Sequence, residues 1–142
     1  MITLEEDNLE AVVKILNAIP EFDDLPNSES IKTRLLGKPH LILTAHDGNK
    51  PIAFKIGYER DNRFYSWLGG VIPSHRSLGV AGKLADRQEE WAKQQGYTSV
   101  WMKTRNRFPA MLLMAVRRGF RIIAIDPRDK ITEHRIVLEK SL

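Results

Sequence analysis

Apolar residues recur along this chain with two different spacings, and the segments that carry them follow one another in a regular order. Spacings of three and four residues, typical of amphipathic helices, occur within 7–19, 29–36, 79–96 and 108–118. Short apolar or alternating runs, typical of strands, occur at 41–46, 51–59, 63–72, 98–103, 120–125 and 135–139. The sequence therefore predicts two helices, three strands, a helix, a strand, a helix and two strands.

Turn residues fix the boundaries of these segments. Asp7 is a candidate N-cap for the first helix, and Asn27 or Ser28 for the second. Asp47-Gly48 predicts a tight hairpin turn. Three hairpin-linked strands followed by a strand–helix–strand unit imply an α/β fold with a mixed sheet covered by helices. Ile2–Leu4 is the only candidate for a further, first strand.

Composition narrows the class of protein. A chain of 142 residues fits one domain over 1–142, and the absence of cysteine excludes thiolate chemistry. No apolar run approaches the ~20 residues of a membrane span, and the acidic N-terminus does not resemble a signal peptide, so we expect a cytoplasmic protein with no membrane partner. The net charge of +4 suits an anionic ligand but is too dispersed to indicate nucleic acid.

The segment from Val71 to Leu84 links a predicted strand to a predicted helix and carries small residues at Gly79, Ala81 and Gly82. Small residues allow a ligand to approach the backbone, and the free N–H groups of a first helical turn favour an anion. Arg76 adds a cation that can contact phosphate. This pattern predicts a pyrophosphate cradle. The alternative is a plain strand-to-helix turn whose glycines ease packing.

The string Val71-x-Pro-x-x-Arg76-x-x-Gly79-x-Ala81 resembles the acyl-CoA signature of the GNAT superfamily of N-acyltransferases, Arg/Gln-x-x-Gly-x-Gly/Ala. The similarity continues through Asn106 to Gly119-Phe120. It implies a GNAT-like fold, in which a three-strand antiparallel meander precedes a β-α-β-α-β-β order. It also implies acetyl-CoA as co-substrate and no metal cofactor.

The same resemblance implies a set of cofactor-binding residues. The strand that ends near Val71 would splay from the next strand and leave backbone groups for the pantetheine arm. The alternative there is a bulge without a ligand, and for Asn106 a helix N-cap. The residues implied are Gly69, Gly70, Val71, Arg76, Ser77, Leu78, Gly79, Val80, Ala81, Gly82 and Asn106.

The catalytic groups are less clearly indicated. Many GNAT enzymes have a tyrosine acid in the helix before Gly-Phe, but the matching positions here are Leu113 or Ala115. The usual acid is therefore absent or has moved. The position implied for a base is Tyr65, which strand alternation places on one face with Trp67, Gly69 and Val71. Glu59 on the neighbouring strand is the better base chemically.

The resemblance implies an N-acetyltransferase that moves an acetyl group from acetyl-CoA to a primary amine of a small molecule or protein, by direct attack. The missing tyrosine motivates a first alternative, a non-catalytic acyl-CoA-binding or sensing module. The positive charge alone motivates a second, a nucleic-acid-binding domain. The acceptor and the oligomeric state stay open, with a homodimer among the options.

Overall fold

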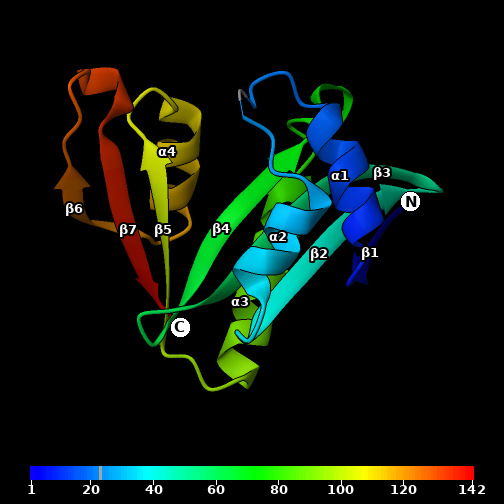
Figure 1. Cartoon of the computed structure of the whole chain (residues 1–142), viewed down its shortest axis with the longest axis horizontal. Coiled ribbons are helices and arrows are strands. Elements are labelled where there is room, and N and C mark those ends of the chain that lie inside the picture. Colours follow the sequence, from blue (N-terminus) through cyan, green and yellow to red (C-terminus); the bar gives the residue numbers. More distant parts are fainter. Residues whose placement is uncertain (23) are drawn as a thin grey trace.

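A computed structural model describes residues 1–22 and 24–142 of the chain (Figure 1). The strands and helices follow one another in a mixed order that confirms the predicted fold class. They are β1 (Ile2–Glu6), α1 (Leu9–Asn17), α2 (Ser28–Leu35), β2 (His40–Asp47), β3 (Lys50–Arg60), β4 (Arg63–Val71), α3 (Val80–Gln94), β5 (Ser99–Arg105), α4 (Pro109–Arg117), β6 (Arg121–Asp126) and β7 (Arg135–Ser141), with short 3-10 turns at Pro73–His75 and Ile131–Glu133.

The strands form one sheet in the order β1-β2-β3-β4-β5-β7-β6. Every neighbouring pair is antiparallel except β4 and β5, which are parallel and connected through α3. The segment predicted as a marginal first strand is real, and β1 pairs with β2 over its full length. The expected meander of β2, β3 and β4 is present.

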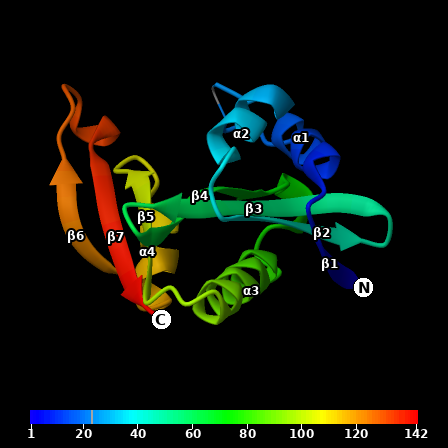
Figure 2. The ribbon, with the colours of Figure 1, turned by 60° about the horizontal axis from the view of Figure 1, so that its bottom comes forward.

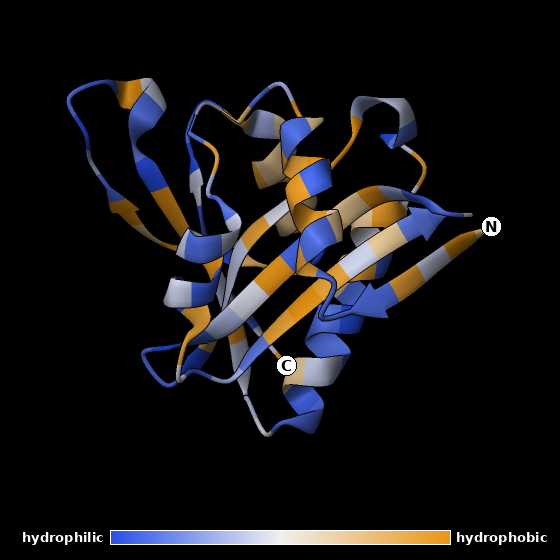
Figure 3. Ribbon diagram, turned by 45° about the vertical axis from the view of Figure 1, so that its right-hand side comes forward, coloured by the Kyte–Doolittle hydropathy of each residue, from blue (hydrophilic) through white to orange (hydrophobic). Residues whose placement is uncertain are grey.

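Helices cover both faces of the sheet. Figure 2 shows α1 and α2 on one face and α3 on the other. The apolar side of α1, including Val12, Ile15 and Leu16, is buried, and α3 buries Val80, Leu84 and Ala92. Apolar stretches run along the strands, whereas the helices carry apolar residues on part of their surface (Figure 3). This division is the expected result of helical and strand periodicities meeting at one core.

The start of α1 differs from the expectation. Asn8, not Asp7, is the N-cap, and its side-chain oxygen accepts a hydrogen bond from the backbone N–H of Ala11 at 3.0 Å. Asp7 instead adopts a left-handed conformation with a φ of 62° in the turn between β1 and α1. The second helix follows the expectation, because Asn27 caps α2 and forms a reciprocal capping box with Ser30.

The parallel strands β4 and β5 pair over a very short length. Only Phe64, Tyr65 and Ser66 are in register with Val100 to Met102. Beyond Ser66 the two strands diverge toward their carboxyl ends, as Figure 1 shows. The edge of β4 that faces β5 is therefore unpaired from Trp67 to Val71.

A β-bulge at Trp67 changes which face each later residue of β4 occupies. Ser66 pairs with Gly57 and Leu68 with Ile56, so Trp67 is the extra residue. A side chain at Gly70 would meet Ile19 and Phe22 on the α1 side, whereas one at Gly69 would meet Lys55 on the α3 side. The prediction that Tyr65, Trp67, Gly69 and Val71 share one face is therefore wrong for Gly69 and Val71, because the bulge shifts the alternation by one residue, whereas Tyr65 and Trp67 both contact Tyr58 on the α1 and α2 side.

The outer strand β6 is exposed along its whole length, including Ile122, Ile123 and Ile125. It pairs with β7 on one side only. Among the helices of the described residues, none combines the length and the apolar character that crossing a bilayer requires.

Candidate active site

The loop before α3 has the geometry of an anion cradle. Ser77 and Gly79 both adopt left-handed conformations, with φ of 64° and 80°. Gly79 is the N-cap of α3 and offers no side-chain acceptor to the first turn. The first intrahelical bond that reaches this end runs from Lys83 N–H to the Gly79 carbonyl. The N–H groups of Val80, Ala81 and Gly82 therefore remain available at the positive end of a 15-residue helix.

The unpaired edge of β4 supplies backbone groups that point toward the same opening. The N–H of Ile72 donates to the Ile52 carbonyl on β3 at 2.9 Å. Successive backbone groups of an extended strand alternate in direction, so the N–H of Val71 points away from β3, into the gap between β4 and β5. The side chain of Arg76 reaches the Val71 carbonyl, at 3.0 Å from Nε. Gly69, two residues earlier, has the same orientation as Val71.

Arg76 already has partners in this structure. Besides its bond to the Val71 carbonyl, its Nη2 lies 2.6 Å from Glu21 Oε2, in the loop after α1. The side chain therefore fastens the α1–α2 loop to the cradle. Leu78, also in the cradle, exposes 64% of its surface, which leaves the loop open to solvent.

Asn106 follows β5 and holds the segment before β7. Its backbone N–H donates to the His134 carbonyl at 2.9 Å, and its side-chain amide donates to the Ile131 carbonyl at 3.1 Å. The N-cap of α4 is Phe108, so the alternative reading of Asn106 as a helix cap is wrong.

Tyr65 lies where β4 and β5 still pair, on the face covered by α1 and α2. Its ring packs against Trp101 at a centroid distance of 4.5 Å and edge-on against Tyr58 at 5.5 Å. Burial raises the pKa of its phenol, although the nearby Arg60 guanidinium opposes that shift. Tyr65 is therefore a neutral phenol at ordinary pH, suited to orienting a group and not to removing a proton.

Glu59 lies on the other face, at the far end of α3 from the cradle. Its Oε1 accepts a hydrogen bond of 2.8 Å from the Tyr97 hydroxyl. Burial and this bond together raise the pKa of Tyr97 to about 12. A helix of 15 residues spans roughly 22 Å, so Glu59 and the cradle are separated by about that length. This placement does not favour Glu59 as a base, and we do not assign it that role.

We compared the chain with known protein families and with solved structures. The model of the acetyltransferase (GNAT) family matches residues 9–120, most of the chain. The chain belongs to the GNAT acetyltransferase family. No curated protein is similar enough in sequence to serve as a relative.

Solved structures agree with this GNAT assignment at the level of fold. The chain resembles Ard1 from Thermoplasma volcanium with a TM-score of 0.86, at 15% identity, covering 99% of this chain and 97% of that one. It resembles the ribosomal-protein-S18-alanine N-acetyltransferase from Escherichia coli with a TM-score of 0.83, at 20% identity, covering 99% and 94%. A GNAT family acetyltransferase from Elizabethkingia anophelis, solved with acetyl-CoA bound, gives 0.78 at 19% identity, covering 99% and 98%.

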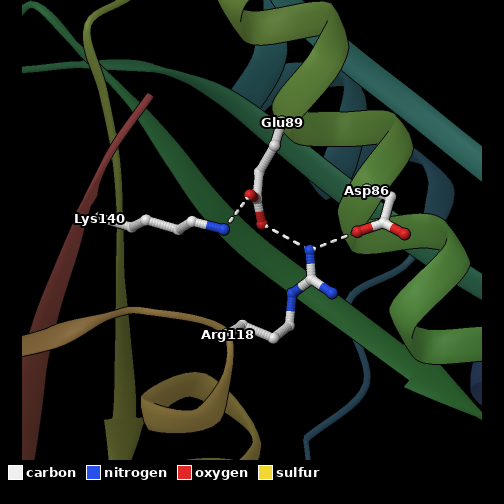
Figure 4. A network of polar contacts seen from close by, with 4 residues as sticks. All are labelled: Asp86, Glu89, Arg118 and Lys140. Atoms are coloured by element: carbon white, nitrogen blue, oxygen red, sulfur yellow. Dashed lines mark hydrogen bonds and ion pairs between the residues drawn. The ribbon is translucent and has the colours of Figure 1, made fainter.

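This GNAT domain also has a polar network between α3 and α4 that the sequence did not predict (Figure 4). Arg118 Nη2 lies 2.7 Å from Asp86 and 2.9 Å from Glu89, and Lys140 Nζ lies 2.5 Å from the other Glu89 oxygen. Burial lowers the pKa of Arg118, but the hydrogen bonds and charges of these two carboxylates together outweigh it and hold the pKa above its usual range. The network joins α3, the end of α4 and β7 on the face opposite α1.

The two positions at which the GNAT resemblance would place an acid have different surroundings. Leu113 exposes 50% of its surface, whereas Ala115 is buried and lines a small cavity together with Ala85 and Gln88 of α3. No group of three or more potential metal ligands occurs among the described residues.

Proposed function

We propose that this protein transfers the acetyl group of acetyl-CoA to a primary amine. The observation that carries the proposal is the gap between β4 and β5, which opens beside the uncapped N-terminus of α3. The amides of Val80, Ala81 and Gly82 suit a pyrophosphate, and the edge of β4 from Gly69 to Val71 suits an amide-containing arm. Gly70, Ser77, Leu78 and Gly79 complete the proposed contact surface. The E. anophelis neighbour, which binds acetyl-CoA, supports the same reading.

The chemistry requires little from the side chains. A neutral amine attacks the thioester carbonyl, and the N–H of Val71 is oriented to donate to the developing oxyanion. Holding both substrates in one cleft supplies much of the acceleration. Tyr65 would orient the acceptor from the α1 and α2 face. Arg76 and Asn106 would shape the cradle and the end of β5 around the cofactor.

The acceptor face is aromatic and positively charged. Its platform, defined as Tyr58, Tyr65, Trp67 and Trp101, is continuous through ring contacts of 4.5–5.8 Å. Five cations lie over its rings. Arg63, which is paired with Glu139, lies 4.6 Å from the Trp101 ring centroid, and Lys103 lies 5.7 Å from it. The other three are Arg34, 4.9 Å from the Trp67 centroid, Lys38, 4.9 Å from Tyr58, and Arg60, 5.1 Å from Tyr65.

These three cations have no carboxylate partner within the described part of the chain. An anionic group would supply what they lack, so we propose an acceptor amine that also carries a carboxylate or a phosphate.

Two measurements test the function. Acetyl-CoA should raise the melting temperature, because a ligand that binds only the native state stabilises it by roughly 2.7 kcal/mol at a hundredfold excess over Kd. An amine panel that follows CoA release should show turnover. A melting shift without turnover on any amine would favour the sensing module, and no shift at millimolar acetyl-CoA would reject both.

The acceptor class has its own test. Amino acids should be acetylated with a higher kcat/KM than their uncharged amides. Arg34→Met and Arg60→Met should each reduce that preference by roughly tenfold, which corresponds to about 1.4 kcal/mol. Equal rates for acids and amides would reject an anionic acceptor.

The homodimer stays a prediction, which sedimentation equilibrium would test.

A further inference from the structure

Lys55 extends from β3 beneath α3 and ends where β4 and β5 separate. Its Nζ lies 3.8 Å from the position that a Cβ at Gly69 would occupy. Gly69 belongs to the edge of β4 that we assign to the pantetheine arm. The ammonium group therefore lies under the strand on which the thioester would rest.

A small cavity connects Lys55 with Ala115, one of the two positions at which the GNAT resemblance would place a tyrosine acid. Lys55, Ser66 of β4, Met102 of β5 and Ala115 of α4 all line it. Its volume is about 20 Å³, enough for roughly one water molecule. The cavity lies at the vertex between β4 and β5, and a side chain larger than alanine at 115 would enter it.

Hydrogen-bond donors outnumber acceptors around this cavity. Within the described residues, no carboxylate or carbonyl accepts a hydrogen bond from Lys55. Glu89, the acidic residue that lines the cavity, is already bound to Arg118 and Lys140. Arg118 Nε and Gln88 Nε2, from two residues that line the cavity, are buried without an acceptor. A buried donor without a partner is costly, and a ligand atom able to accept a hydrogen bond would relieve the cost.

We propose that Lys55 donates the proton that the sulfur of CoA takes up as it leaves. This role rests on the proposed acetyl transfer and supplies the acid that neither Leu113 nor Ala115 can provide. In the step, the amine nitrogen forms a bond to the carbonyl carbon and loses a proton to water. The C–S bond breaks, the sulfur leaves with the electron pair, and that sulfur takes a proton from the Lys55 ammonium. Solvent then reprotonates the Lys55 amine.

The electrostatic surroundings of Lys55 suit this task. Burial is the main cause that lowers its pKa to about 8; Arg118 lowers it further and Glu89 opposes the shift. The thiol of a cysteine has a pKa of about 8.5, and proton transfer is efficient when the pKa values of donor and acceptor are close. The charged groups that face this region are Asp86 and Glu89 from α3, Arg118 after α4 and Lys140 from β7. Ser66 and Met102 do not titrate in this range.

Two variants of Lys55 and one control variant test whether the side chain of Lys55 donates a proton to the leaving sulfur. Lys55→Met removes the proton donor. Lys55→Arg keeps the positive charge, but a guanidinium does not release its proton at any pH used in the assay. Lys93→Met, at an exposed position near the end of α3, is the matched control. Both Lys55 variants should keep acetyl-CoA affinity within about threefold while kcat falls by at least roughly thirtyfold. The wild-type kcat should decline above a pH near 8, and both variants should lose that decline.

A rescue variant separates proton donation from a structural role. Lys55→His puts a smaller proton donor at the same position of β3, and kcat should recover at least roughly fivefold over Lys55→Met. The decline at high pH should return at a lower pH, because an imidazole has a pKa of about 6.5.

Several outcomes would overturn the role. An unchanged kcat in Lys55→Met, beside an active wild-type protein, would reject it and leave the proposed function intact. Mass spectrometry that finds an acetyl group on Lys55 during turnover would make it an acceptor and not a donor. A wild-type protein that binds acetyl-CoA but acetylates no amine would reject the proposed transfer, and this role with it.

Discussion

Glu21 and Arg76 form an ion pair with an N–O distance of 2.6 Å that connects the loop after α1 to the loop before α3. Both side chains are about half exposed, so the pair itself contributes at most about 1 kcal/mol to stability. Its importance lies in where it holds the guanidinium, beside the proposed pyrophosphate cradle.

Releasing Arg76 from that pair should strengthen cofactor binding. In Glu21→Gln the guanidinium would be free to contact phosphate, and we expect acetyl-CoA affinity to rise by roughly two- to fivefold in calorimetric titrations. Arg76→Ala should reduce the affinity by a larger factor. Glu10→Gln, on the exposed face of α1, is the control. An unaltered Kd in both Glu21→Gln and Arg76→Ala would show that Arg76 only fastens the loop.

Position 82 allows a matched pair of substitutions in the cradle. A Cβ there would lie 3.9 Å from Arg118 Nη1 and meet nothing closer, and its φ is ordinary for a helix. Gly82→Ala should therefore fold, gain up to about 1 kcal/mol of helix stability and still bind acetyl-CoA. Gly82→Asp should fold but lose binding, because its carboxylate would repel the pyrophosphate. Equal binding by the two variants would mark the loop as a plain turn.

The lowered pKa of Lys55 predicts a pH-dependent stability. The folded protein releases this proton at a pH of about 8, whereas the unfolded chain releases it near 10.5. Between these values the unfolded chain binds more protons, so the free energy of unfolding contributed by this group rises with pH. Lys55→Met should stabilise the unliganded protein at pH 7 by up to about 3 kcal/mol, and the difference should shrink toward pH 10. Denaturant titrations at several pH values measure it. A difference independent of pH would contradict the shift.

We expect Tyr65 to orient the acceptor amine and not to transfer a proton. Its raised pKa keeps the phenol neutral through the assay range, so Tyr65→Phe should lower kcat by less than roughly tenfold. The pH dependence of kcat should keep its shape. If instead the decline at high pH disappears in Tyr65→Phe, then Tyr65 and not Lys55 is the acid, and steady-state kinetics of the two single variants decide between them.

Local signals in the sequence were enough to predict the order of elements and the turn that leads from β4 into α3. The loop at Gly79 depends on residues a few positions apart, and its switch from strand to helix periodicity is visible in the chain. The mixed sheet followed from the same periodicities and from short connections. Predicting these features does not require knowing which residues far apart in the sequence are in contact.

The features that the sequence did not predict all depend on distant partners. The bulge at Trp67 exists only in relation to Gly57 and Ile56 on β3. The hydrogen bond that Glu59 accepts from Tyr97, 38 residues away, could not be predicted from the sequence around Glu59. One feature of the sequence could have drawn attention to Lys55: it is a charged residue between the apolar residues Phe54 and Ile56 of a predicted strand. Only the fold shows that it ends at the vertex of β4 and β5.

The short pairing of β4 with β5 also bears on how the molecule holds together. Three register pairs join the unit of β1 to β4 to the unit of β5 to β7, so few backbone bonds oppose a change in the angle between them. A cofactor arm lying in the gap would act as an additional strand and stiffen that joint. Amide hydrogen exchange in β5 and in the second half of β4 should then slow together when acetyl-CoA binds, even at residues that never touch it.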